Sequence, residues 1–296
     1  MQKENLTKAE IVDVMEKLCA GELLGAEAGA FLMGLTVKGE TEEEIMALVE
    51  YLRSHMIPVS GVTHALDTCG TGGDGAQTIN VSTMAAFVCA AAGVPVAKHG
   101  NRAVSSRCGS FDLLEKLGVN IHLSAEQAKQ CFDKTGLAFL FAQNFQPAFK
   151  AIAPIRKSLG IRTVFNYLGP LLNPAGVEYQ MIGVSSPVLA QKLGPILIKL
   201  GSKKVVFVHS ADGLDEVSPA APTQVFEYIE NRDMKRYEIR PTEFYPLELV
   251  RGGGVEENTA RTLTILSGQG TPAETAFISL NAGLALYTAG EVSSFF

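Results

Sequence analysis

The stretch LDTCGTGGDGAQTINVST, residues 66–83, decides the fold of this chain. It opens with a short apolar run, which predicts a buried strand, and continues with four glycines, at Gly70, Gly72, Gly73 and Gly75. Glycine lets a backbone turn sharply and approach a ligand closely. Ser82 and Thr83 then precede an alanine-rich apolar run that stops at Gly93 and predicts a buried helix. A strand, a glycine loop and a helix start in succession indicate an anion site, because loop N–H groups and the helix dipole point at the same charge.

The loop also fits the Gly-x-Gly-x-x-Gly pattern of dinucleotide-binding proteins. That pattern requires an acidic residue about 20 positions further on, which binds a ribose. Here the next predicted strand ends in Lys98, and a cation suits phosphate rather than a ribose diol. No Gly-Lys-Ser/Thr follows the loop, so it is not a Walker A loop. A dinucleotide-dependent dehydrogenase is therefore disfavoured.

Composition narrows the class of protein. The chain has 296 residues, is 47% hydrophobic and carries a net charge of −6, which predicts one large domain or a large and a smaller one. The acidic balance argues against nucleic acid as the main partner. The five cysteines are scattered, as expected of reduced thiols in a cytoplasmic protein. The polar N-terminus is not a signal peptide, and no apolar run is long enough to span a membrane, so we expect no membrane partner.

Hydrophobic periodicity predicts a helical start followed by an α/β domain. Within the first sixty residues, capping boxes at Thr7–Glu10 and Thr41–Glu44 each predict the start of a helix, and a further helix is predicted between them at 26–37. From residue 65 onward, strands at 66–69, 94–97, 137–142, 180–184 and 204–209 alternate with helices at 84–92, 111–117, 125–135 and 186–200. Such alternation predicts a mostly parallel sheet with helices on both faces and ligands beyond the carboxyl ends of the strands.

Three further motifs carry chemistry. Residues 98–110, KHGNRAVSSRCGS, lead from a strand into a helix and combine cations, glycines and serines, which suits phosphate. Asp215 and Glu216 follow a strand, and adjacent carboxylates suit Mg²⁺. Arg156 could bind a carboxylate through its guanidinium, or form a surface salt bridge. Pro170 and Pro174 punctuate a predicted short helix and turn.

In combination and order, these motifs resemble those of anthranilate phosphoribosyltransferases over nearly the whole chain. The resemblance implies transfer of phosphoribose from phosphoribosyl pyrophosphate to anthranilate in tryptophan biosynthesis, with Mg²⁺, expected as two ions, and a homodimer. It implies a small helical domain at 1–63, joined by part of 163–178, and an α/β catalytic domain at 64–296. Substrates would lie in the cleft between these domains.

The resemblance also implies the site residues. Magnesium would be bound by Ser82, Asp215 and Glu216, and anthranilate by Gly70, Asn101 and Arg156. No covalent or strong general-base residue is expected. Phosphoribosyl pyrophosphate would contact two groups of residues, namely Gly70, Gly73, Asp74, Thr78, Asn80, Val81, Ser82 and Thr83, and then Lys98, His99, Gly100, Asn101, Arg102, Ala103, Val104, Ser105, Ser106 and Ser110.

The chain departs from the family pattern on the acceptor side, with Gln146 where the family often has histidine and Ala151 where it has an aromatic residue or histidine. Two alternatives share the fold. A pyrimidine nucleoside phosphorylase would use phosphate and would not need the acid pair at Asp215 and Glu216. A non-catalytic relative that binds nucleic acid is disfavoured by the acidic net charge.

Overall fold

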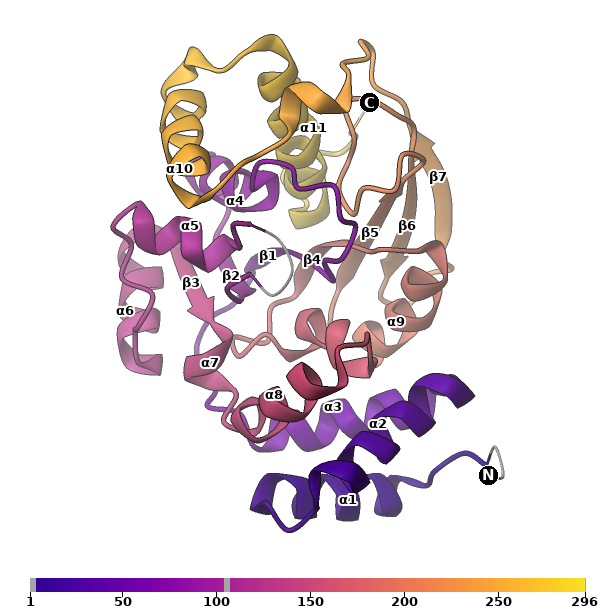
Figure 1. The fold of residues 1–296 in the computed structure, drawn as a ribbon. Coiled ribbons are helices and arrows are strands. Elements are labelled where there is room, and N and C mark those ends of the chain that lie inside the picture. Colours follow the sequence, from indigo (N-terminus) through magenta and orange to yellow (C-terminus); the bar gives the residue numbers. More distant parts are fainter. Residues whose placement is uncertain (1–3, 104–106, 296) are drawn as a thin grey trace.

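The computed structural model describes residues 4–103 and 107–295 (Figure 1). Three helices form its N-terminal end: α1 (Lys8–Ala20), α2 (Gly25–Lys38) and α3 (Glu42–Ser54). Thr7 caps α1 and Thr41 caps α3, each in a reciprocal capping box with the glutamate three residues on. These contacts confirm the capping boxes predicted from the sequence, and they satisfy backbone N–H groups that a helix start leaves free.

A seven-stranded sheet follows, in the order β3-β2-β1-β4-β5-β6-β7. The first five strands are parallel: β1 (Leu66–Gly70), β2 (Val96–Gly100), β3 (Leu137–Phe141), β4 (Tyr179–Gly183) and β5 (Lys204–Ser210). The last two, β6 (Thr223–Ile229) and β7 (Lys235–Ile239), are antiparallel. The predicted, mostly parallel sheet is confirmed.

Helices cover both faces of the sheet (Figure 1). On one face α4 (Val81–Ala91) packs against α11 (Pro272–Ala289), and α10 (Val255–Thr264) contacts α5 (Ser110–Lys116). On the other face lie α9 (Pro187–Lys199) and the 3₁₀ turn η2 (Gly169–Leu172). The remaining elements are α6 (Ala125–Thr135), α7 (Ala142–Phe145), α8 (Ala148–Leu159), η1 (Val164–Asn166), η3 (Leu247–Val250) and the π-helical turn η4 (Ile265–Gln269).

Alternating side chains of the sheet serve two different cores. In β5, Val205 and Phe207 belong to the core shared with the N-terminal helices, whereas Val206 and Val208 belong to the core beneath α4 and α11. This is the period of two expected of a strand that is buried on both faces. Fully burying each such side chain contributes roughly 1.5–3 kcal/mol, so the sheet is a rigid base for the loops at its carboxyl edge.

Two parts of the sequence prediction need correction. The second strand was expected at 94–97, but β2 runs from Val96 to Gly100, so Lys98 and His99 belong to the strand rather than to a loop. These two residues are 2% and 4% exposed, because α4 and η2 cover the two faces of the sheet at β2. The strands β6 and β7 and the helices α10 and α11 were not predicted, since the region after Asp215 offers no comparable alternation.

The predicted turn between Pro170 and Pro174 lies next to the N-terminal helices. Val164, Phe165 and Leu171 share one core with α1, α2 and α3, and α8 also packs against α1 and α2. These contacts support the proposal that part of 163–178 joins the helical domain at 1–63, beside an α/β domain at 64–296. No helix among the described residues combines the length and the apolar character needed to cross a bilayer.

Candidate active site

The glycine loop lies where the strand order of the sheet reverses. The chain passes from β1 to β2 and β3 on one side, then returns to place β4 on the other side of β1. Ligands of such sheets bind at the carboxyl ends of the strands beside this reversal. Gly70 ends β1 and lies opposite Gly183, which ends β4. The loop predicted to bind an anion therefore occupies the expected position.

Asp215 crosses above the ends of both strands, which requires glycine at position 183 and leaves little room for a side chain at position 70. A Cβ at Gly183 would lie 1.7 Å from the Asp215 carbonyl oxygen, and a Cβ at Gly70 would lie 3.1 Å from the Asp215 carboxylate. The backbone N–H of Gly72 donates a hydrogen bond to that carboxylate at 3.0 Å. The glycine loop and the acid pair, 143 residues apart in the sequence, are thus brought into contact.

Three carboxyl groups gather at this contact. Asp215 is 9% exposed, and burial, together with the neighbouring Asp74 carboxylate, raises its pKa to about 7. Burial and the charge of Asp215 raise the pKa of Glu216 well above its ordinary value, while the Lys98 ammonium acts in the opposite direction. Burial and neighbouring carboxyl groups make the charged forms of these acids costly, and a divalent cation bound here would lower these pKa values again.

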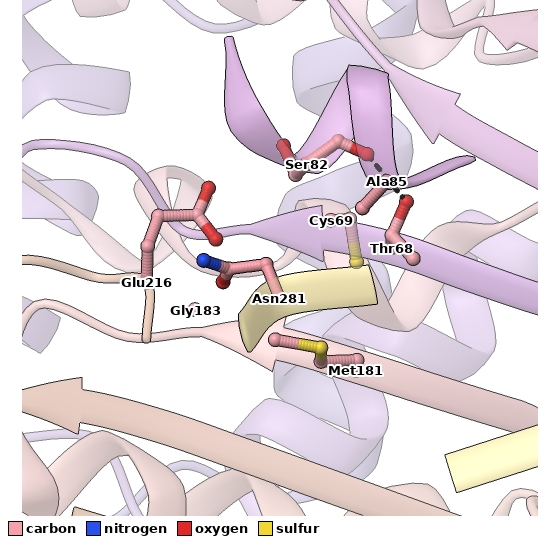
Figure 2. A pocket seen from close by; sticks show the side chains of 8 residues that line it. All are labelled: Thr68, Cys69, Ser82, Ala85, Met181, Gly183, Glu216 and Asn281. Atoms are coloured by element: carbon pink, nitrogen blue, oxygen red, sulfur yellow. Dashed lines mark hydrogen bonds between the residues drawn. The ribbon is translucent and has the colours of Figure 1, made fainter. Parts of the chain in front are cut away.

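Ser82 and Glu216 face the same small cavity (Figure 2). Its volume is about 10 Å³, room for roughly one water molecule. Hydrogen bonding with the Ser82 hydroxyl lowers the pKa of Glu216, although burial outweighs this effect. Thr68 holds the first turn of α4 in place by donating from its hydroxyl to the Ser82 carbonyl at 2.9 Å. Two of the three predicted metal ligands, Ser82 and Glu216, therefore lie together, while Asp215 precedes Glu216 in the chain and is not among the residues that line this cavity; oxygen donors of this kind suit Mg²⁺.

The side chains of Lys98 and His99 lie inside the protein. The Lys98 ammonium donates to the Thr68 carbonyl, on the side of the sheet where it also influences Glu216. The His99 ring lies 3.1 Å from the Gly169 carbonyl through Nδ1, and burial lowers its pKa to about 4. A direct phosphate contact by either side chain stays a prediction.

One aspartate, Asp112, forms hydrogen bonds to both ends of the segment that follows β2. The Asp112 carboxylate accepts hydrogen bonds from the backbone N–H groups of Ala103 and Gly109, at 2.9 and 3.0 Å. Arg102 pairs with Asp112 at 3.3 Å and with Glu115 at 2.7 Å, and these partners raise its pKa. Its guanidinium is therefore already paired with two acids of α5. Its contact with phosphate stays a prediction.

The other residues predicted to contact phosphoribosyl pyrophosphate differ in how exposed they are. Gly70 and Gly73 are exposed, and Thr78 and Asn80 are half-buried, whereas Val81 and Thr83 are buried in the first turn of α4. Gly100 is half-buried, and Ser110 donates from its hydroxyl to the Asn101 carbonyl at 3.2 Å, which joins both ends of the second loop. Predictions for Val104, Ser105 and Ser106 lie outside the described residues.

Arg156 is a half-buried cation on α8. Among residues 4–103 and 107–295 its guanidinium has no hydrogen-bond or ion-pair partner, and burial lowers its pKa. It makes no hydrogen bond to Gly70 or Asn101, the other predicted acceptor contacts. A guanidinium left unpaired in this way suits a carboxylate ligand. The alternative prediction, a surface salt bridge, is not seen in the part of the chain that the structure describes.

The two departures on the acceptor side have different surroundings. Gln146 is fully buried, and its amide donates to the Leu172 carbonyl at 3.2 Å, while its Oε1 has no partner among the described residues. Ala151 is half-buried on α8, the helix that carries Arg156. Gln146 thus packs against η2, and Ala151 is the departure that shares an element with the predicted carboxylate contact.

Known protein families agree with this geometry. Residues 62–295 match the glycosyl transferase family α/β domain, and residues 1–56 match the helical bundle domain of the same family. The anthranilate phosphoribosyltransferase of Herpetosiphon aurantiacus is 45% identical over 99% of this chain and 88% of its own length. The chain belongs to the anthranilate phosphoribosyltransferase family of glycosyl transferases.

Solved members of the family share the fold. The Thermus thermophilus enzyme aligns with a TM-score of 0.90 at 40% identity, over 99% of this chain and 88% of that one. The Saccharomyces cerevisiae enzyme in complex with PRPP and Mg aligns with a TM-score of 0.89 at 27% identity, over 98% and 86%. The same yeast enzyme in complex with 4-fluoroanthranilate gives 0.87 at 26%, over 98% and 86%.

The sequence did not predict several residues that lie outside the motifs and form hydrogen bonds to the two loops. Arg162, between α8 and η1, donates from its guanidinium to the carbonyls of Gly72 and Gly73, both at 3.1 Å. Asp112 anchors the second loop, as described above, and Asn258 in α10 contacts Asn80. Nothing in their local sequence marks them, because their partners lie far away along the chain.

Proposed function

We propose that the chain transfers the phosphoribosyl group of phosphoribosyl pyrophosphate to the amine of anthranilate in tryptophan biosynthesis. The products are N-(5-phosphoribosyl)anthranilate and pyrophosphate. The observation that carries this proposal is the bond from Gly72 to Asp215, which brings an anion-binding loop against a group of acids. The family match over nearly the whole chain fixes the reaction.

The donor would bind over the glycine loop and the second loop. Exposed backbone at Gly70 and Gly73 would face the anion, and the dipole of α4 would favour the same charge, although the N–H groups of Val81 and Thr83 already bond to the Ile79 and Asn80 carbonyls. The proposed donor contacts are those implied by the resemblance, namely residues 70, 73, 74, 78, 80–83, 98–106 and 110. Besides its proposed donor contact, the Lys98 ammonium, which donates to the Thr68 carbonyl, would act on the charge of the acid group through space.

Ser82, Asp215 and Glu216 would hold magnesium, as two ions. Among residues 4–103 and 107–295, no three His, Cys, Asp or Glu side chains are arranged to hold a metal by themselves. Remaining ligands would come from the Ser82 hydroxyl, water and the phosphates of the donor, which is how Mg²⁺ is commonly bound beside a phosphate ester. When bound, the metal would supply positive charge against the departing pyrophosphate.

Anthranilate would bind with its carboxylate on Arg156, beside Gly70 and Asn101. The unpaired guanidinium supports this assignment, since a half-buried cation gains most from a charged partner. The amine of anthranilate is a weak nucleophile, so the reaction depends on departure of pyrophosphate. The loops would orient the donor and stabilise charge on the leaving group, and no covalent intermediate or strong general base is needed.

We also propose that the chain works as a homodimer in the cytoplasm. Leu24, Met33 and Val37 are exposed apolar residues of the α2 region, which supports an interface on the helical domain. The five cysteines are free thiols, as expected in a reducing compartment. The mass of the protein in solution, measured by light scattering, tests the dimer.

A fluorescence assay tests the function. Purified protein is mixed with phosphoribosyl pyrophosphate, Mg²⁺ and anthranilate, and loss of anthranilate fluorescence is followed over time. We expect turnover that stops when a chelator removes the metal. A parallel assay with uridine or thymidine and inorganic phosphate tests for a nucleoside phosphorylase, and activity there without activity on anthranilate would overturn the proposal.

A further inference from the structure

Two asparagine side chains connect three loops around the proposed donor site. Asn258 lies in α10 and is 2% exposed, and Asn80 immediately precedes α4. The Asn258 side-chain nitrogen donates to the Asn80 side-chain oxygen at 3.1 Å. The Asn80 nitrogen in turn donates to the Cys108 carbonyl at 3.0 Å, and the Gly253 N–H donates to the Asn258 oxygen at 2.8 Å. A continuous path of hydrogen bonds therefore joins the residues 252–254, 78–80 and 107–110.

The direction of this path is fixed at both ends. The Gly253 N–H can only donate, so it selects the oxygen of the Asn258 amide and leaves the nitrogen for Asn80. The Cys108 carbonyl can only accept, so it selects the nitrogen of the Asn80 amide and leaves the oxygen for Asn258. An aspartate at position 258 cannot serve both neighbours, because its carboxylate accepts hydrogen bonds and donates none.

The residues before α10 also pack directly on the glycine loop. The Gly252 N–H donates to the Gln77 carbonyl at 2.7 Å, and the Ile79 N–H donates to the Val250 carbonyl at 3.0 Å. A Cβ at Gly252 would lie 2.7 Å from the Asn258 side-chain oxygen and 2.9 Å from the Thr78 carbonyl. The glycine at 252 is therefore needed for this close approach, and the segment forms an outer wall of the donor loop.

We infer that Asn258 is a positioning residue for the diphosphate donor, a role that rests on the proposed function. It holds Asn80, and through Asn80 it sets the start of α4 and its separation from the loop at 107–110. Ser82 lies two residues further on, in the first turn of α4. Both hydrogen-bonding ends of the Asn80 amide are engaged by the protein, so the contact of Asn80 with donor belongs to its backbone.

The inference predicts a selective loss of donor binding in Asn258→Asp. Opposed oxygens at positions 258 and 80 would push α10 away from the start of α4, or would turn the Asn80 amide and break its bond to the Cys108 carbonyl of the second loop. We expect the Kd of phosphoribosyl pyrophosphate with Mg²⁺, measured by calorimetry, to rise about tenfold, equivalent to about 1.4 kcal/mol. The KM for the donor should rise in parallel, while the KM for anthranilate stays within about twofold of wild type.

Asn144→Asp is the matched control. Its side-chain nitrogen donates to the carbonyls of Ile121 and Leu123, at 2.9 and 3.4 Å, away from the three loops. The same substitution there removes donated hydrogen bonds and should lower Tm without changing donor Kd. Asn80→Asp should reproduce the donor defect, since it removes the bond to Cys108.

The results of these experiments distinguish the positioning role of Asn258 from the proposed function. An Asn258→Asp protein that loses Tm as the control does but binds the donor as wild type overturns the positioning role and leaves the function intact. Equal increases in KM for both substrates would also overturn it, as a general loss of structure. Wild-type protein that binds no donor in the presence of Mg²⁺ would overturn the function and the inference together.

Discussion

Two polar regions border the central strands of the sheet and differ in how their charges and hydrogen bonds are satisfied. In the acid group, Asp74, Asp215 and Glu216 repel one another, and burial raises the pKa of the last two. In η2, four consecutive carbonyl groups each contact a side chain from a different part of the chain. The pairs are Gly169 with His99 at 3.1 Å, Pro170 with Gln180 at 2.8 Å, Leu171 with Arg53 at 2.8 Å and Leu172 with Gln146 at 3.2 Å.

This difference distinguishes a region suited to binding a ligand from a region that stabilises the fold. A buried acid whose charge is unmet destabilises the free protein and favours a ligand that brings positive charge. The four η2 carbonyls each have a side-chain partner, although His99 Nε2 and Gln146 Oε1 have none among the described residues, and displacing the segment would break these four contacts. We therefore expect changes in the acid group to remove activity at little cost in stability, and changes near η2 to remove stability first.

The largest effect should come from Asp215→Asn combined with Glu216→Gln. Loss of both carboxylates should lower kcat/KM by at least about 10³-fold, because the charge proposed to hold the metal is gone. Tm should stay the same or rise, since mutual repulsion is relieved. The matched control is Glu230→Gln with Asp233→Asn, which changes the same charge at exposed positions of the β6–β7 hairpin. Near-wild-type turnover in the first variant would remove the metal role.

Asn173→Ala should show the opposite behaviour. The Asn173 amide donates to the Asp67 carboxylate and to the Ala97 carbonyl, both at 2.8 Å, and its oxygen accepts from the Ala175 N–H at 2.9 Å. Losing these buried bonds should cost about 4 kcal/mol in unfolding free energy, measured by urea denaturation. At low temperature kcat should remain within a few-fold of wild type. Asn120→Ala, at an exposed position, should leave stability nearly unchanged, and a comparable loss there would contradict the contrast.

The pH dependence of the unfolding free energy gives a further test of the region near η2, through the buried Asp67. Burial raises the pKa of Asp67 from 3.8 to about 6, although the Lys98 charge opposes the shift. The folded protein therefore holds this proton more tightly than the unfolded chain. Its contribution to stability is complete below about pH 4 and is lost as pH rises to about 6, at a cost of about 3 kcal/mol. Relative to Asp67→Asn, the unfolding free energy of wild type should fall across that window; parallel curves would show that Asp67 titrates normally.

The smallest effect is expected at Arg156, which we propose contacts only anthranilate. Arg156→Ala should raise the KM for anthranilate about 30-fold, or about 2 kcal/mol, because a charge-assisted bond to the carboxylate is lost. The KM for the donor should change by less than about threefold, and Tm very little. Lys157→Ala is the control, an exposed neighbour on the same helix. Equal increases in both KM values would make Arg156 a structural residue.

The sequence predicted the parts of the fold that depend on neighbouring residues. The capping boxes at Thr7 and Thr41 and the strands at the glycine loop follow from local patterns, and the structure confirms them. The strand boundary at Lys98 was wrong, because a charged residue and a histidine are rarely expected inside a strand until their buried partners are known. The elements after Asp215 were missed since their patterns are weak.

The sequence by itself determined the chemistry of the site, because glycines, paired acids and a serine at a helix start carry that chemistry in their own structure. Only the tertiary structure decided which of these groups meet. Asp215 reaches Gly72 across 143 residues, and Asn258 reaches Asn80 across 178. The physical reason is that hydrogen-bond partners distant in the chain leave no local periodicity, and they are selected only when packing of the sheet and helices brings them within about 3 Å.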